Sequence, residues 1–471
     1  MAKRLVLAMS AAMIAGCAVG PSYEKPALEN KAAGKWGEAS SDKVSSQQIQ
    51  LVQWWTVFKD ERLAALVDRA VAANFDLALA ESRVREARAE YRAAVGDFLP
   101  TVDASASATR QRLSENGSQN VGGFSPPLYS TLYQAGFDAG WEIDVFGGKR
   151  RAIEAASASL EASVEDRRAV LVSLLGEVAR NYLVLRGSQR QIAVIRANVR
   201  SAGETLELTR TRLRGGLGTD LDVARAEGQL ATTTSLIPSL ETQLRQAAHR
   251  LGLLLGLEPN ALKAELLPEA AVPAPPPVVA VGIPSDLLAR RPDVRRAERE
   301  LAAATARVGV ATADLYPKFS IGAFLGLASV SSGDLLKWQS RAWSIGPSVV
   351  FPLFHGGQIR ANIEVQSARQ EQARIGFEKA FLGALGEVED ALVAYLQEGE
   401  RRKSIAEAVA SNERAVRLVS DRYTKGLTAF LDVLEAERSL YGTQQQLAQS
   451  DVQLSLNLVA LYKALGGGWQ E

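Results

Sequence analysis

Two stretches of the sequence, "RLRGGLGTDLDVARAEGQL" at 212–230 and "DRYTKGLTAFLDVLEAERSL" at 421–440, resemble one another. The residues that match at an offset of 210 are Gly216 and Gly426, Leu217 and Leu427, Asp222 and Asp432, Glu227 and Glu437, and Leu230 and Leu440. The same offset pairs Leu255-Gly256 with Leu465-Gly466. Self-similarity at a fixed spacing predicts that the chain contains two copies of one structural unit.

The two copies and the segments around them divide the chain into five predicted parts. In chain order they are a signal peptide (1–16), a lipidated N-terminal segment (17–60), the first repeat (61–256), a Pro-rich linker (257–284) and the second repeat (285–471). Predicted strands lie at about 98–145 and 316–354, and predicted helical hairpins at about 149–256 and 358–466. The linker includes "VPAPPPVVAVGIP" at 272–284, which is typical of extended polyproline II structure.

Each predicted hairpin begins with an unusually long helix. No Pro interrupts the chain from Lys149 to Arg214 or from Gln358 to Lys425, and such a helix is about 100 Å long at 1.5 Å per residue. The second helix of each hairpin carries an apolar residue every seven positions, namely Val223, Leu230, Ile237, Leu244 and Leu251, and Val433, Leu440, Leu447, Leu454 and Leu461. This heptad indicates a coiled coil, and the alternative is an amphipathic face on an ordinary helical core. Pro238 predicts a kink.

The segments before the long helices alternate apolar and polar residues. From Tyr133 to Val145 every odd position is apolar, and Phe319 to Leu327 repeats the pattern. Trp343 to Leu353 supplies another apolar face, and Val102 to Ala108 a weaker one. Period-2 alternation predicts strands, one hairpin in each repeat, of a length that suits a membrane strand. The edge of a soluble sandwich is the alternative.

A count of strands gives a condition on assembly. No stretch after Cys17 has 18 consecutive apolar residues, so strands are the expected way for the mature chain to cross a membrane. Four strands per chain cannot close a barrel, because small membrane barrels need at least about eight. A membrane barrel therefore requires a homo-oligomer, and three chains supply twelve strands.

Composition excludes several classes of protein. The 471 residues contain 54 Lys and Arg and 53 Asp and Glu, so the net charge of +1 gives no sign of nucleic-acid binding. One Cys and two His exclude a disulfide within the chain and the common zinc sites. No catalytic constellation is present. We therefore expect no enzyme activity, no metal and no cofactor.

The first 17 residues have the pattern of a secretory signal. Lys3 and Arg4 precede an apolar run from Leu5 to Ala15, and Ala15-Gly16-Cys17 ends it. This ending resembles a bacterial lipobox, which implies cleavage before Cys17 and attachment of fatty acyl chains to it. An ordinary signal peptide with an incidental Cys is the alternative. Ala18 follows Cys17, and by the sorting rule of such lipoproteins this favours the outer membrane.

The motifs and their order resemble the TolC-like outer-membrane efflux channels, and most closely the NodT-type lipoproteins. The resemblance rests on the lipobox, "AVGPSYEKP" after it, Trp54-Trp55, "WEIDVFGGKRRA" and the two "GLxxxLDV" turns. It implies a trimeric 12-strand outer-membrane β-barrel continuous with a 12-helix periplasmic coiled-coil tunnel. Such a homotrimer is the passive exit duct of a tripartite pump, and its partners are a periplasmic adaptor and an inner-membrane transporter such as an RND pump.

The resemblance also assigns candidate functional residues. The hairpin tips, with Gly216, Leu217, Gly426 and Leu427, are expected to contact the adaptor and to close the periplasmic entrance. Asp432, Glu435 and Asp222 are candidates for an acidic ring, and Tyr423 and Arg225 for the ties that hold it shut. Alternatively, Asp222 and Asp432 cap their helices. From strand alternation, Asp138, Glu142 and Asp144 are expected to face the barrel lumen.

A second function remains open at this stage. A periplasmic adaptor or coiled-coil scaffold also carries a lipid anchor and a helical hairpin. Adaptors normally have one hairpin inserted into soluble β-domains, whereas this sequence has two hairpins and two strand pairs. The sequence does not reveal the exported substrate.

Overall fold

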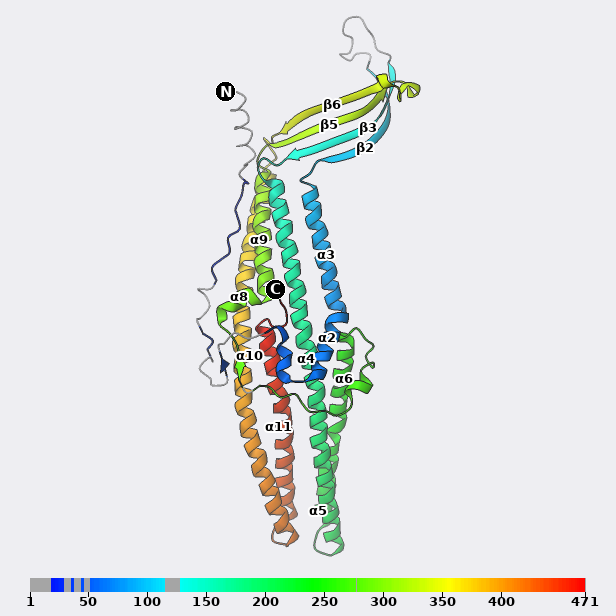
Figure 1. The fold of residues 1–471 in the computed structure, drawn as a ribbon. Coiled ribbons are helices and arrows are strands. Elements are labelled where there is room, and N and C mark those ends of the chain that lie inside the picture. The colour runs from blue at the N-terminus through cyan, green and yellow to red at the C-terminus, as the bar shows by residue number, and fades with distance from the viewer. Residues whose placement is uncertain are drawn as a thin grey trace. The chain divides into compact units, whose positions relative to one another are not determined.

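The computed structural model describes residues 18–28, 35–37, 44–45, 51–114, 128–276 and 278–470. The predicted signal peptide and Cys17 lie outside the described residues. Long helices and one four-stranded sheet account for most of the described chain (Figure 1).

The strand pairs and the helices on either side of them follow one another in the same order in the two halves of the chain. In the first half the elements are β1 (Val44–Ser45), η2 (Leu51–Phe58), α2 (Glu61–Ala73), α3 (Phe75–Gly96), β2 (Thr101–Arg112), β3 (Tyr129–Ile143), α4 (Gly148–Arg214), α5 (Asp220–Ser235), α6 (Ile237–Leu254) and α7 (Lys263–Leu266). In the second half they are β4 (Val279–Ala280), η3 (Pro284–Asp286), α8 (Leu287–Arg290), α9 (Pro292–Ala313), β5 (Lys318–Ser329), η4 (Ser332–Asp334), η5 (Trp338–Ser340), β6 (Arg341–Val350), α10 (Gln358–Thr424) and α11 (Phe430–Ala464).

The duplication is visible in the lengths of the helices. α3 and α9, which precede the strand pairs, have 22 residues each, and α4 and α10, which follow them, have 67 each. The bounds of α4 and α10 agree within one residue with the Pro-free stretches in the sequence. The helices α3 and α9 were not predicted individually. Each half therefore contains a helix, two strands, a long helix and a returning helical segment.

The four long strands form one antiparallel sheet in the order β2-β3-β5-β6. β2 pairs with β3, and β5 with β6, so each half supplies one strand hairpin, as the alternation predicted. The register places Ala104, Phe137, Leu325 and Trp343 opposite one another across the strands. One face of the sheet is therefore apolar, and the opposite face carries most of its polar side chains.

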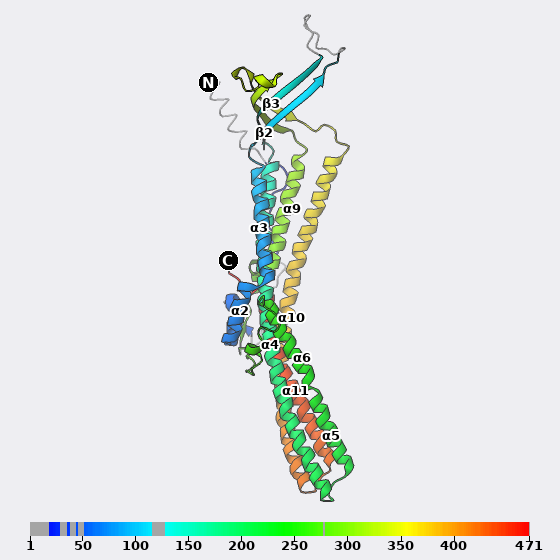
Figure 2. The ribbon, with the colours of Figure 1, turned by 90° about the vertical axis from the view of Figure 1, so that its right-hand side faces the viewer.

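The returning segment of the first hairpin is broken where the sequence predicted a kink. α5 ends at Ser235 and α6 begins at Ile237, with Pro238 in its first turn. Pro is tolerated there because the first amides of a helix have no partner within the helix. α11 runs unbroken through the matching part of the second hairpin. α5 lies beside α4, and α11 beside α10, in both views of the ribbon (Figures 1 and 2).

The heptad residues of both hairpins lie on packed faces. Leu251 and Leu461 are fully buried, and the other members of the two stripes are buried or half-buried. This agrees with the coiled-coil prediction. No helix of the described ranges combines the length and apolarity needed to cross a membrane.

The chain divides into two units, and each unit contains segments of both halves. Unit 1 comprises 1–26, 84–162 and 297–376 and contains the sheet. Unit 2 comprises 27–83, 163–296 and 377–471 and contains the tips of both helical hairpins.

Within unit 1, the "AVGPSYEKP" stretch lies against α9. Tyr23 donates a hydrogen bond to Glu298 (3.0 Å), and Lys25 forms an ion pair with the same carboxylate (3.2 Å). Gly20 has a positive φ of 85°, and a Cβ there would lie 2.5 Å from the Cα of Gly309. Only Gly permits this close approach of the two backbones.

Within unit 2, Trp54 joins the beginning and the end of the chain. Its ring stacks on Tyr462 in α11 at 5.5 Å and meets Trp55 edge-on at 6.0 Å. Gly468 donates its amide to the carbonyl of Leu51 (2.9 Å). The Trp54-Trp55 motif therefore anchors η2 to the last helix.

Candidate functional site

The two hairpin tips share one turn geometry. Leu217 donates its amide to the carbonyl of Arg212 (2.8 Å), and Leu427 donates to Arg422 (2.9 Å). Gly216 and Gly426 have positive φ values of 71° and 76°. These features define a Schellman motif, which satisfies the last carbonyls of α4 and α10.

An apolar side chain projects from each turn. Leu217 is 70% exposed and Leu427 is 64% exposed, and each directly follows the Gly with positive φ. Exposed leucines at matching positions of two tips leave an apolar contact available at each tip.

Both predicted acidic residues cap the helix that follows the turn. The amide and hydroxyl of Thr219 donate to the Asp222 carboxylate at 3.2 and 2.8 Å. The Asp432 carboxylate accepts from the amide of Ala429 (3.3 Å) and from the hydroxyl of Thr428. The N-cap residues are thus Thr219 and Ala429, and the carboxylates act from the third helical position. This geometry supports the capping interpretation and leaves a pore role untested.

Glu435 and Arg225 make no hydrogen bond or ion pair with any described residue of the chain. Glu435 is exposed on α11, and Arg225 is half-buried on α5. Arg225 was predicted to tie the entrance shut, and its guanidinium finds no partner for this in the part of the chain that the structure describes. Both side chains remain available to another protomer.

Tyr423, the other predicted tie, contacts an arginine that the sequence analysis did not name. Arg212, in the last turn of α4, lies over the Tyr423 ring at 4.5 Å. Its guanidinium donates to the carbonyls of Tyr423 (3.0 Å) and Thr424 (3.3 Å). Tyr423 is 4% exposed, and its hydroxyl has no hydrogen-bond partner. Within one chain, Tyr423 therefore joins the hairpins through its backbone and ring.

An apolar cluster fills the space between the four helical segments behind the tips. Its buried members are Leu206, Ala226, Tyr423, Phe430, Val433 and Leu434. The second hairpin supplies four of these six residues, and α4 and α5 supply one each. The two hairpins are thus packed on one another immediately behind the turns.

Glu437 lies further along α11 and was not predicted as a site residue, although it matches Glu227 in the repeat. It is 3% exposed and accepts a hydrogen bond from the Thr205 hydroxyl of α4 (2.6 Å). Burial raises the pKa of the Glu437 carboxyl. The spacing from Val433 and to Leu440 is four and three residues, which places Glu437 on the apolar face. This spacing in the sequence could have predicted that Glu437 is buried.

A neighbouring residue makes another link between the hairpins. Arg438 of α11 donates to the side-chain oxygen of Gln229 in α5 (2.7 Å). Sequence reasoning missed this contact, because it depends on the pairing of α5 with α11.

The three predicted lumen carboxylates do not share one environment. Asp138 is exposed in mid-strand and accepts from the Ser105 hydroxyl (2.5 Å). Glu142 lies in β3 near the end of the strand, 3.7 Å from the Lys149 ammonium.

Asp144 corrects the prediction. It follows the end of β3, and its carboxylate accepts the amides of Lys149 (3.1 Å) and Arg150 (2.9 Å) at the start of α4. The same carboxylate also forms an ion pair with the Arg150 guanidinium (3.1 Å). Asp144 thus has a structural role, because the free amides at a helix start attract a carboxylate.

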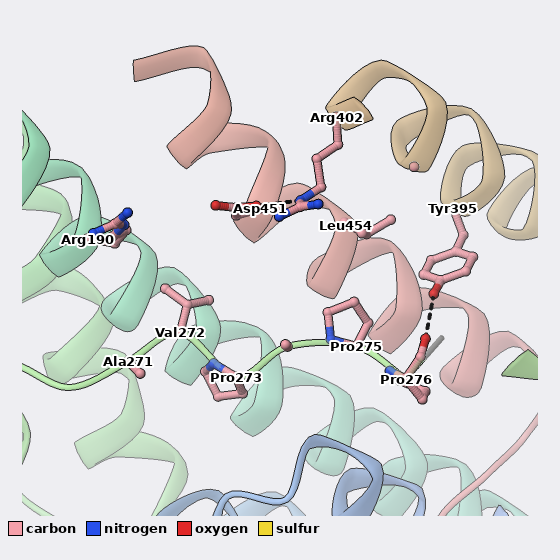
Figure 3. Close-up of a pocket in the computed structure, with 12 residues that line it drawn as sticks. Arg190, Ala271, Val272, Pro273, Pro275, Pro276, Tyr395, Arg402, Asp451 and Leu454 are labelled. Atoms are coloured by element: carbon pink, nitrogen blue, oxygen red, sulfur yellow. Dashed lines mark hydrogen bonds and ion pairs between the residues drawn. The ribbon is translucent and has the colours of Figure 1, made fainter. Parts of the chain in front are cut away.

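A cavity of about 570 Å³ lies between the Pro-rich linker and the hairpin helices of unit 2 (Figure 3). Ala271 to Pro276 form one wall, and side chains of α4, α10 and α11 form the others. Figure 3 shows Arg402 directed toward Asp451, with an Nε–Oδ1 distance of 2.5 Å, and the Tyr395 hydroxyl directed toward the Pro276 carbonyl at 3.3 Å. The Tyr395 contact fixes the linker to the second hairpin, and the Arg402–Asp451 ion pair joins α10 to α11.

Among the described residues, no group of three or more His, Cys, Asp or Glu side chains is arranged to hold a metal ion. His249 contacts Asn260 at 3.1 Å.

Comparison with known proteins identifies the class to which this fold belongs. The family described as outer membrane efflux protein matches residues 66–257 and 283–467. The chain is 31% identical over 462 residues to nodulation protein T of Rhizobium leguminosarum bv. trifolii, covering 97% of this chain and 96% of the relative. It is 35% identical over 436 residues to the pyoverdine export outer membrane protein OpmQ of Pseudomonas putida, covering 92% of each.

A solved structure has the same fold over nearly the whole chain. The outer-membrane channel OprN superposes with a TM-score of 0.91 at 36% sequence identity, covering 97% of this chain and 100% of that one. The chain belongs to the outer membrane efflux protein family.

Membership of this family establishes the oligomeric state, the partners and the location of the protein. The protein is the outer-membrane channel component of a tripartite efflux pump, and it works with a periplasmic adaptor and an inner-membrane transporter. Three chains form the channel, with a β-barrel and a helical tunnel that extends into the periplasm. The relatives give no support to the adaptor alternative. Lipid anchoring is typical of the NodT type, and its attachment at Cys17 remains a prediction.

Proposed function

We propose that the hairpin tips form the periplasmic entrance of a passive duct, with Asp432, Glu435 and Asp222 as its acidic ring. The observation that carries this proposal is Glu435, an exposed carboxylate near the second tip that has no hydrogen-bond or ion-pair partner among the described residues. Threefold symmetry repeats each carboxylate three times around one axis. Like charges near an axis repel one another and attract cations into the pore.

The capping hydrogen bonds are compatible with this role. Each capping carboxylate uses Oδ2 for the cap, and Asp432 is exposed while Asp222 is half-buried. Arg225 and Tyr423 are the proposed ties between protomers, and the free guanidinium of Arg225 supports its part in this. Leu217 and Leu427, with the glycines before them, are the proposed contacts of the adaptor.

Planar-bilayer recordings of the purified trimer test the acidic ring. Glu435→Gln removes charge without touching a cap, so we expect the preference for cations over anions to fall. Asp222→Ala with Asp432→Ala is expected to raise the resting conductance. Asp222→Asn with Asp432→Asn separates the two roles, because Asn keeps an oxygen for the cap but loses the charge.

Asp421→Asn is the matched control. Its carboxylate lies near the same tip and pairs with Lys425 (2.7 Å), so the variant changes the charge of the tip by the same one unit without touching the proposed ring. We expect it to leave the preference for cations unchanged. If Glu435→Gln and the double Asn variant conduct like the unmodified trimer, the acidic ring is refuted and capping alone explains the aspartates.

In the barrel, Asp138 and Glu142 are the proposed lumen carboxylates, and they would give a weak preference for cations.

We also propose that the duct performs no chemistry on what it carries. The family consists of channel proteins, and the described residues present no metal-binding cluster. The relative named for pyoverdine export shows one cargo of this family, and the cargo of this chain is best sought in its transporter, where selectivity is expected to reside.

A further inference from the structure

Glu437 is a buried carboxyl group for which neither capping nor the acidic ring accounts. Its neighbours along α11 are Val433 and Leu434 one turn before it and Leu440 and Tyr441 one turn after it. The first pair belongs to the apolar cluster behind the tips, and the second pair belongs to another apolar cluster with Ala202 and Val409. Glu437 therefore lies between two apolar clusters that hold the hairpins together.

The matching residue of the first hairpin has the opposite environment. Glu227 is exposed and forms an ion pair with Arg210 (2.7 Å). Glu437 makes no ion pair with any described residue, and the Thr205 hydroxyl is its one hydrogen-bond donor. A buried carboxylate without a cation is costly, and a buried neutral carboxyl group is much less so.

We propose that Glu437 is a positioning residue of the periplasmic entrance: its neutral form ties the second hairpin to the first through Thr205, and its ionisation favours their separation. This inference rests on the proposed function of the tips. A neutral carboxyl keeps the hydrogen bond across α4 and α11 without burying a charge. When the hairpins separate, water reaches the group and favours the carboxylate.

The direction of the pH effect follows from linkage. Burial raises the pKa of Glu437 in the joined state above the value of about 4.3 for a solvated Glu. The tie is therefore fully present below the pKa of the separated state and is lost as the pH rises through the raised pKa of the joined state. A lower pH therefore holds the hairpins together, and a rising pH loosens them.

The neighbouring charged groups do not offset this effect. On α4, Glu204 is exposed, and on α5 Glu227 is paired with Arg210. On α11, Arg438 donates to Gln229. Tyr441 stays neutral throughout, because burial and then the charges of Glu437 and Glu204 raise its pKa to about 12. α10 contributes Val409, Val416 and Val419 to the two clusters on this side.

Conductance of the full-length trimer in planar bilayers between pH 4 and 8 tests the proposal. In the unmodified channel we expect resting conductance to rise with pH, by up to about tenfold for each unit by which the pKa of the joined state exceeds that of the separated state. Glu437→Gln is expected to remove this part of the pH profile and to keep conductance low over the whole range, because its amide stays neutral. Glu227→Gln is the control and is expected to keep the pH profile of the unmodified channel.

Thr205 provides a second pair of variants. Thr205→Val keeps the shape but removes the hydroxyl whose hydrogen bond lowers the pKa of Glu437, so the rise in conductance should move to higher pH. Because the tie itself is lost, conductance at acidic pH should also be higher than in the unmodified channel. Thr205→Ser restores the hydroxyl and should restore the profile. A purely structural role for Thr205 would change stability without moving the midpoint of the pH profile.

Hydrogen exchange of the α11 amides around Glu437 tests the tie between the hairpins separately from its effect on the entrance. Protection factors, corrected for the intrinsic pH dependence of exchange, should fall with pH in the unmodified trimer and not in Glu437→Gln. Equal protection of the two proteins at every pH would overturn the tie. Exchange that follows Glu437 while conductance ignores it would overturn the link to the entrance.

Discussion

The two hairpins have the same turn and different interiors. Both tips end in a Schellman motif with Gly at positive φ, followed by an exposed Leu and a capping Asp. The first hairpin places Asp220 and Glu227 on its surface, whereas the second buries Phe430 and Glu437 at the matching positions. The turn depends on backbone conformation that both copies retain. The interiors differ because the second hairpin supplies most of the apolar cluster behind the tips.

The largest expected difference between the hairpins concerns Phe430. Its side chain is 3% exposed within the apolar cluster, so Phe430→Ala should cost about 3–5 kcal/mol of local stability. Asp220→Ala, at the matching position of the first hairpin, loses only the interaction of a charge with a helix start, less than about 1 kcal/mol. Native-state hydrogen exchange of the first turns of α11 and α5 measures both. Equal effects would contradict the assignment of the core to the second hairpin.

Arg212 gives the next largest difference. Arg212→Ala removes two hydrogen bonds to the end of α10 and the contact with the Tyr423 ring, which should cost about 1.5–3 kcal/mol. Arg422, which matches Arg212 in the repeat, is exposed and makes no contact of this kind. We expect Arg422→Ala to change stability by less than about 1 kcal/mol. The rate of proteolytic cleavage at each tip reports the effect, and faster cleavage in Arg422→Ala than in Arg212→Ala would refute the prediction.

The shared turn predicts equal effects in the two copies. An added Cβ at Gly216 or Gly426 would meet no other atom within 4 Å, so the cost of Ala is conformational alone. Gly216→Ala and Gly426→Ala should each cost about 1–2 kcal/mol. The temperature at which the trimer dissociates should fall by similar amounts in the two variants. Unequal shifts would show that the turns are not equivalent.

The smallest expected effects concern the N-caps. Thr219 completes a capping box with Asp222, whereas Ala429 has no side-chain oxygen for its helix. Thr219→Ala should cost about 1 kcal/mol, and Ala429→Thr should stabilise its helix by a similar amount. Amide exchange in the first turn of α5 and of α11 is the measurement. Destabilisation by Ala429→Thr would indicate that Thr428 already occupies the capping role fully.

Several features of the fold were predicted from local patterns. The bounds of α4 and α10 were predicted within one residue, because Gly-containing turns flank each long helix and no Pro interrupts the sequence between them. The break beside Pro238 and the pairing of β2 with β3 followed from equally local signals. Asp144 was placed on the strand face by extending the alternation one residue too far. The register of a strand does not show where it ends, and the free amides of α4 decided that position.

By itself, the sequence determined the duplication, the long helices, the strand pairs and the two turns. These features arise from residues near one another in the chain, where periodicity, Pro and Gly act directly on the backbone. Only the tertiary structure decided that Arg212 donates hydrogen bonds to the end of α10 and that Glu437 is buried while Glu227 is exposed. The physical reason is that the two hairpins come from different repeats. Their contacts depend on the packing of helix faces more than 200 residues apart in the chain, such as Thr205 and Glu437.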